Sequence, residues 1–178
     1  FSFQTVVKAN EIRDFEIEGI SIGDSLTQFY NKSELLEFSS SFYPNSKKYK
    51  MMALTDERFE KYDFIQVEFL TDDLNYIIHS ISGVLNIKID LCLNKKEKIR
   101  KSIVNFLKDV EITDFKKNKH SNNYPNSYNY ETSFLFKNKD KIRLYCMDWS
   151  DSSGFKDHLS LDLSTKEFRV WLNSNAYK

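Results

Sequence analysis

The chain has few residues of the kinds that end secondary structure or link domains. Its 178 residues include only 4 Gly and 2 Pro, which excludes collagen-like and flexible-linker compositions. Apolar residues make up 40% of the sequence and aromatic residues 15%, too many for a disordered chain. This length is sufficient to bury a sizeable core. It predicts a single domain, residues 1–178, or two small halves that share a core.

An excess of charge is also absent. The sequence holds 26 Lys and Arg against 26 Asp and Glu, whereas dedicated nucleic-acid binders usually carry a basic excess. No apolar run approaches the roughly 20 residues that a membrane-spanning helix needs. We therefore expect no nucleic-acid partner and no transmembrane segment.

The motifs of common catalytic and metal sites are missing as well. There is no Gly-rich phosphate loop, no Ser-centred elbow and no paired-carboxylate signature. His79, His120 and His158 have no ligand at a recognised metal spacing. The acidic loop at residues 148–157 lacks the spacing of an EF-hand. The sequence thus predicts no catalytic, cofactor-binding or metal-binding residues, no cofactor and no enzyme activity.

In the first half of the chain the most informative stretch is residues 15–30. Its pattern predicts an extended segment, a turn and the start of a helix. Asp24 is predicted to cap that helical turn, and Asn31 with Glu34 is predicted to form a capping pair for the next. Residues 39–48 read as a loop. The apolar alternation then predicts strands at residues 49–54, 62–70 and 75–90, the last bent at Gly83.

The second half shows the clearest helix. Apolar residues with a 3.6-residue period predict it at residues 94–110. The Lys- and Asn-rich residues 114–127 read as a mobile loop. Further strands are predicted at residues 128–136, 141–149 and 158–163, followed by a short closing helix.

This order predicts an α+β fold in which a helix followed by three strands occurs twice. Short links favour a mainly antiparallel sheet, with helices packed on one face and a short C-terminal helix. The two halves would be residues 15–90 and 91–172, sharing one sheet.

One strand of the second half suggests a binding surface. Tyr145, Met147 and Trp149 alternate onto the same face as Lys141 and Arg143. If helices leave that face uncovered, the strip is suited to a protein partner. The alternative is that a second layer covers it. The basic run between residues 95 and 119 has the same two interpretations, a solvated face or a surface for anionic groups.

Several segments resemble a family of small, functionally uncharacterised, exported bacterial proteins. The segments are IEGISIGDSL at residues 17–26, HSISG at 79–83, CMDWS at 146–150, KDHL at 156–159, TKEF at 165–168 and AYK at 176–178. Together they span nearly the whole chain. Members of this family look like proteins with an N-terminal signal peptide, so the resemblance implies a periplasmic or secreted location. A start at Phe1 is compatible with signal-peptide removal and equally with a trimmed N terminus.

A weaker likeness is to the fold of the β-lactamase-inhibitor proteins and the small outer-membrane-assembly lipoproteins. Residues 20–25, ISIGDS, look similar to the Ile-x-x-Gly-x-Ser/Thr segment that begins a helical pair in those proteins. This chain departs from them because it has no second copy of the segment and no lipobox cysteine at its start. The likeness implies helices packed on an antiparallel sheet.

The exported family favours a Cys92–Cys146 disulfide, because disulfides persist in oxidising compartments. Two reduced core cysteines are the alternative. A Cys146–His158 nucleophile and base pair is a further interpretation that no neighbouring residue supports.

The function expected from these observations is non-catalytic binding. We predict a monomeric exported module that binds another protein or a cell-envelope component through Tyr145, Met147 and Trp149. The alternative is a small-molecule or lipid carrier with an aromatic-lined pocket. A hydrolase that uses Cys146 or His158 is the third reading.

Overall fold

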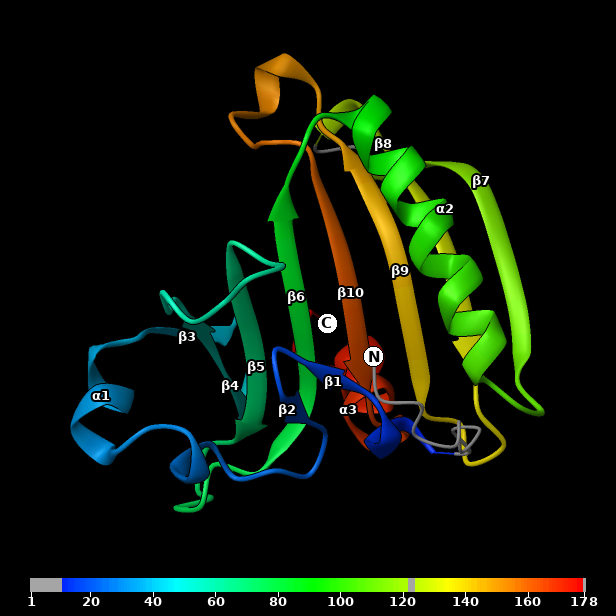
Figure 1. The fold of residues 1–178 in the computed structure, drawn as a ribbon. Helices are drawn as coiled ribbons and strands as arrows, with labels where there is room; N and C mark the ends of the chain where they lie inside the picture. Colours follow the sequence, from blue (N-terminus) through cyan, green and yellow to red (C-terminus); the bar gives the residue numbers. More distant parts are fainter. Residues whose placement is uncertain (1–10, 122–123, 178) are drawn as a thin grey trace.

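The computed structural model describes residues 11–121 and 124–177, and its main feature is one large antiparallel sheet (Figure 1). The strand order is β3-β4-β5-β6-β10-β9-β8-β7. The strands are β3 (Ser39–Tyr43), β4 (Ser46–Leu54), β5 (Phe64–Leu70), β6 (Ile78–Asn86), β7 (Glu111–Ser121), β8 (Tyr124–Leu135), β9 (Lys141–Asp148) and β10 (His158–Ser164). A small hairpin, β1 (Glu16–Ile17) and β2 (Ile20–Ser21), lies outside this sheet.

The helices are α1 (Lys32–Glu37), α2 (Ile89–Phe106) and α3 (Lys166–Trp171), with single turns η1 (Ile12–Asp14), η2 (Leu26–Gln28), η3 (Asp151–Ser153) and η4 (Leu172–Ala176). Among the described residues, no helix has the length and apolar character needed to span a bilayer.

The two halves of the sheet meet at its centre. β3 to β6 form one antiparallel series, β7 to β10 form another, and β6 pairs with β10. The register of that pair sets Ser82 opposite Asp162 and Ile81 opposite Leu163. Because successive side chains of a strand point to opposite faces, this register gives the central pair one polar face and one apolar face.

The apolar face is covered by α2 and by an N-terminal segment, residues 12–26. In Figure 1, α2 crosses in front of β8 and β9, and the β1–β2 hairpin lies in front of β6 and β10. The layer between them is a continuous core, which includes Ile65, Ile81, Leu144 and Leu163, all fully buried. Burial of apolar area at about 25 cal/mol per Å² is the main force that holds this side together.

A disulfide joins the covering helix to the sheet. Cys92 of α2 is bonded to Cys146 of β9, as the resemblance to the exported family implied, and both side chains are fully buried. The bridge closes a loop with a sequence separation of 54 residues, for which the loop-entropy description gives a stabilisation of about 4 kcal/mol. The bond therefore fixes α2 on the apolar face.

The other face is covered only at one end. There α3 and η4 pack on β3 and β4, and Figure 1 shows α3 behind β10. The contact is a separate aromatic cluster, in which Tyr43 and Tyr49 of the strands pack against Phe168 and Trp171 of α3.

The prediction of a helix and three strands, occurring twice with helices on one face, is wrong. Ten strands are described, eight of them in one sheet, and α2 and α3 lie on opposite faces. Two predicted loops contain strands instead: residues 39–48 include β3, and residues 114–127 include most of β7 and the start of β8. Both missed elements are the edge strands of the sheet. Edge strands are often polar and Lys-bearing, so they lack the apolar alternation on which the prediction rested.

Local predictions around residues 15–30 were partly right. The Asn31–Glu34 capping pair is confirmed at the start of α1. Asp24 does not cap the following turn: its carboxylate accepts from the Ser21 N–H at 2.8 Å, while Ser25 caps η2 by accepting from Thr27.

The predicted bend at Gly83 is absent, because β6 runs through it in register with both neighbours. A Cβ added there would lie 2.8 Å from the Tyr62 ring. Gly83 thus lets an aromatic ring lie directly on the strand.

Candidate binding groove

The uncovered part of the second sheet face is hollowed into a groove with a volume of about 820 Å³. We call it the polar groove. Its floor is formed by β5, β6, β10, β9 and β8, and its lining on these strands comprises Phe64, Gln66, Glu68, Ser80, Ser82, Val84, Asn86, His158, Ser160, Asp162, Ser164, Lys141, Arg143, Tyr145 and Glu131.

The groove is hollow because its central floor residues are small. Ser80 and Ser82 of β6 lie opposite Ser164 and Asp162 of β10, and Ser160 lies opposite Val84. The intervening residues on the apolar face are mostly Ile and Leu. The same two strands therefore fill one side with large side chains and leave space on the other.

One end of the groove is closed by the C-terminal elements, with Phe168, Arg169, Leu172 and Tyr177 in its wall. We call this the α3 end. The opposite end is lined by Trp149, Phe155 and Lys156, and we call it the Trp149 end.

An ion network crosses the floor. The Arg143 guanidinium lies 2.9 Å from Glu131 Oε2 and 3.5 Å from Asp162 Oδ2, and Lys141 Nζ lies 3.3 Å from Glu131 Oε1. Burial alone would raise the pKa of Glu131, but the hydrogen bonds and charges of Arg143 and Lys141 outweigh it and hold that pKa below its ordinary value. Burial dominates at Asp162, whose pKa is raised despite Arg143. Ion pairs with Arg143 thus orient both carboxylates, Glu131 and Asp162.

Glu68 belongs to the floor but lies outside this network. Its Oε1 accepts from the Gln66 amide at 2.7 Å and from the Tyr43 hydroxyl at 3.3 Å. Its Oε2 is buried and has no hydrogen-bond partner within residues 11–121 and 124–177. Burial raises the pKa of Glu68 to about 7, although hydrogen bonds from Gln66, Ser80 and Tyr43 oppose that rise. A carboxyl group with this pKa changes its charge near neutral pH.

An aromatic cluster builds the Trp149 end. The Trp149 ring centroid lies 4.8 Å from that of His120, 5.3 Å from Tyr124 and 4.8 Å from Phe155. Phe155 is still 55% exposed. The Trp149 backbone N–H donates to Asp157 at 2.8 Å. The cluster holds the η3 loop against the β7–β8 hairpin and gives the groove a firm apolar rim.

Of the three residues predicted to form the interaction surface, two line the groove and one does not. Tyr145 and Trp149 line the polar groove, together with Lys141 and Arg143. Met147 is only 4% exposed and does not line it. The sequence prediction missed Glu68, Asp162 and the floor serines. The sequence did contain a sign of Asp162 and the serines. Every second residue in much of segments 78–86 and 158–164 is Ser or Asp, which indicates a sheet face that is not packed under an apolar layer.

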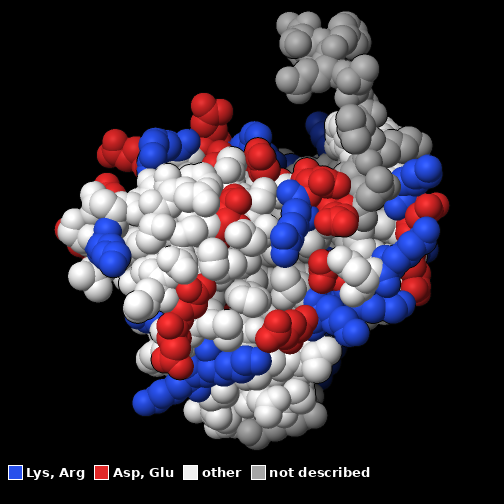
Figure 2. All heavy atoms as spheres, turned by 90° about the horizontal axis from the view of Figure 1, so that it is seen from below, with Lys and Arg blue, Asp and Glu red and all other residues white. Residues whose placement is uncertain are grey.

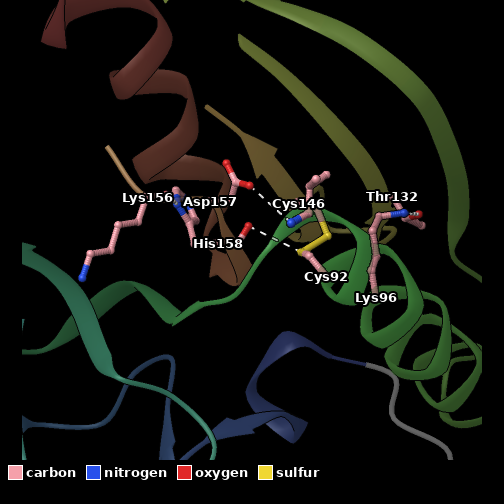
Figure 3. The surroundings of a disulfide bond; sticks show 8 residues. Cys92, Lys96, Thr132, Cys146, Lys156, Asp157 and His158 are labelled. Carbon is pink, nitrogen blue, oxygen red and sulfur yellow. Dashed lines mark hydrogen bonds between the residues drawn. A yellow bond between two sulfur atoms is a disulfide. The ribbon is translucent and has the colours of Figure 1, made fainter. Parts of the chain in front are cut away.

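Cys146 and His158, the residues considered as a nucleophile and base, do not form such a pair. Cys146 is in the disulfide and offers no thiolate, and Figure 3 shows the bridge between α2 and β9 with the His158 carbonyl beside it. The His158 ring Nδ1 lies 3.1 Å from the Lys156 carbonyl oxygen. Within the described residues, no group of three or more His, Cys, Asp or Glu side chains is placed to hold a metal ion.

The lower face of the molecule shows no dominant charge. Figure 2, which views the lower end of the molecule in Figure 1, shows basic and acidic side chains interspersed around a largely uncharged area. On α2, Arg100 pairs with Asp114 of β7 at 2.7 Å and Lys96 donates to Thr132 of β8 at 2.8 Å. Part of the basic run thus attaches the helix to the sheet.

Comparison of the chain with protein families, with curated proteins and with solved structures finds no match. The two sequence resemblances therefore stay predictions, and the polar groove is the feature from which function is inferred.

Proposed function

We propose that the chain is a non-catalytic binding module that holds a segment of another protein, or of a cell-envelope component, in the polar groove. The observation that carries this proposal is the groove itself, a hollow of about 820 Å³ on a sheet face that bears desolvated charges. Burying polar groups costs free energy unless they are paired. A concave site with a few oriented polar groups is the usual form of a binding site.

The lining favours a polar occupant over a lipid. Aromatic rings such as Trp149 and Tyr177 line its two ends, whereas Tyr49, Phe69 and Phe134 are fully buried in the packed clusters and offer no surface to a ligand. Serines, carboxylates and basic groups form most of the groove floor. An extended peptide segment, which carries regularly spaced hydrogen-bonding groups, fits such a floor better than an acyl chain does.

We also propose an oxidising location, periplasmic or secreted. The Cys92–Cys146 bridge supports it, because structural disulfides are rare in reducing compartments.

A matched pair of substitutions tests the groove. Phe155, 55% exposed, lies on the groove rim, and Leu91, 59% exposed, lies on α2 over the opposite face. Peptides are selected from a random displayed library on the wild-type chain, and their affinities for Phe155→Ala and Leu91→Ala are measured.

If the groove is the binding surface, Phe155→Ala weakens the selected peptides about tenfold, the effect of losing roughly 1.4 kcal/mol of contact. Leu91→Ala leaves them unchanged. Equal effects of both substitutions, or no selectable peptide at all, would contradict the proposed function.

A further inference from the structure

The carboxylates of the groove floor differ in whether the residues that the structure describes supply them with a cation. Glu131 has Arg143 and Lys141, and Asp162 has Arg143. Glu68 has no ion pair among the residues that the structure describes, and its Oε2 has no hydrogen bond. It is nevertheless 2% exposed. A buried carboxylate oxygen without a partner normally carries a penalty of about 1–3 kcal/mol or more.

The position of Glu68 within the groove explains why Lys141, the cation in the same row of the sheet, does not reach it. The row across the sheet runs from Glu68 to Ser80, Ser164 and Lys141. Three strand spacings separate its ends, roughly 14 Å. Lys141 is moreover engaged with Glu131. The two residues between Glu68 and Lys141 are serines, so the space above them belongs to the groove.

The groups that face Glu68 are donors and aromatic rings. Tyr43 of β3 and Gln66 of β5 donate to its Oε1, and Ser80 of the facing strand also favours the charged form of Glu68. Its Oε2 has no hydrogen bond within the described residues that meets ordinary geometry. Tyr177 and Arg169 lie in the wall at the same end of the groove, and Asp162 of β10 adds a like charge that raises the pKa of Glu68 further. A negative acceptor beside tyrosine rings is a favourable setting for an ammonium or guanidinium group.

We propose that the polar groove has a specificity subsite at Glu68, which takes one basic side chain, a lysine or an arginine, of the partner protein. The N–H of this side chain donates to the Glu68 carboxylate, which thereby gains a cation that residues 11–121 and 124–177 do not provide. The proposal rests on the proposed function, because it names what the partner presents to the groove. It predicts a ligand with a basic residue at one fixed position.

The test uses the peptides selected from the random displayed library on the wild-type chain. We expect an arginine or lysine at one fixed position of these peptides. Replacing it with citrulline or norleucine should weaken binding about 30-fold, the equivalent of the roughly 2 kcal/mol lost when one partner of a buried charge pair is removed.

The chain variant Glu68→Gln supplies the other half of a double-mutant cycle. It is isosteric, so folding is expected to be retained, which circular dichroism and a thermal midpoint check. On Glu68→Gln the penalty for the neutral peptide should shrink to less than about threefold. The matched control Glu37→Gln, an exposed carboxyl group of α1, should keep the full penalty.

The outcomes separate the two proposals. Peptides that depend on Phe155 but show no preference for a basic residue, or whose basic residue is not coupled to Glu68, would overturn the subsite and leave the groove as the binding surface. Failure to obtain any peptide sensitive to Phe155→Ala would overturn the binding function and the subsite with it.

Discussion

The two faces of the central β6–β10 pair are built from alternate residues of the same strands and have opposite characters. On one face, Ile81 and Leu163 lie opposite each other, fully buried under α2 and the N-terminal segment. On the other, Ser82 and Asp162 lie opposite each other at the floor of the polar groove. A strand can thus fill a core with one set of side chains and line an open groove with the other. The difference lies in side-chain size and in what covers each face.

The two faces should differ most in the loss of stability when a buried side chain is truncated to alanine. Leu163 and Ser164 are adjacent, similarly buried and on opposite faces. Leu163→Ala should lower the free energy of unfolding by about 3 kcal/mol, because it removes buried methyl groups and leaves a cavity. Ser164→Ala, at the next residue, should cost less than about 1 kcal/mol, since it removes one long hydrogen bond to the Lys141 carbonyl, 3.4 Å. Urea denaturation measures both. Similar costs would mean that the groove face is as important to stability as the core.

The groove face, unlike the apolar face, should make the stability of the fold depend on pH, through Glu68. The folded state raises the pKa of Glu68 from its ordinary value of 4.5 to about 7, so between these values it holds a proton that the unfolded state has released. Stability from this group is complete below pH 4.5 and is lost as the pH rises through 7. The raised pKa corresponds to about 3 kcal/mol.

Urea denaturation of the wild type and Glu68→Gln at pH 5 and pH 8 isolates this contribution. Relative to the variant, the wild type should lose stability between the two pH values. A difference that stays constant, or has the opposite sign, would show that Glu68 is ionised and well solvated in the folded state.

The smallest expected effect compares two adjacent residues of β6. Gly83→Ala should destabilise the fold by about 1–3 kcal/mol, because the new methyl group would lie 2.8 Å from the Tyr62 ring. Val84→Leu adds volume to the groove face, where space is available, and should change stability by less than about 0.5 kcal/mol. Thermal midpoints of the two variants provide the comparison. If Val84→Leu is the more harmful change, the groove is packed more tightly than the structure indicates.

The same distinction explains which parts of the fold could be predicted from the sequence. The strands at residues 62–70, 141–149 and 158–163 were predicted within two residues of β5, β9 and β10, because each has one apolar phase. The edge strands β3 and β7 were missed, since an edge strand with Ser- and Lys-rich faces has no such phase. Without them the count of strands in each half, and hence the fold, was wrong.

The candidate site was predictable only in part. Alternation was enough to set Tyr145 on the face of Lys141 and Arg143, and all three line the groove. The buried environment of Glu68 depends on pairing between strands that are distant in sequence and on the position of Tyr43. Neither follows from a local pattern. Whether helices cover a face is likewise decided by tertiary packing.

Binding in the polar groove is tested most directly by finding which face of the sheet touches a bound peptide. Val84 faces the polar groove, whereas Leu144 of β9 is buried on the opposite face. Intermolecular NOEs are measured between a peptide selected on the wild type and the methyl groups of the chain. We expect NOEs to Val84 and none to Leu144 or to exposed Leu91 on α2. NOEs confined to Leu91 and other residues of α2 would contradict the claim that the polar face is the binding surface.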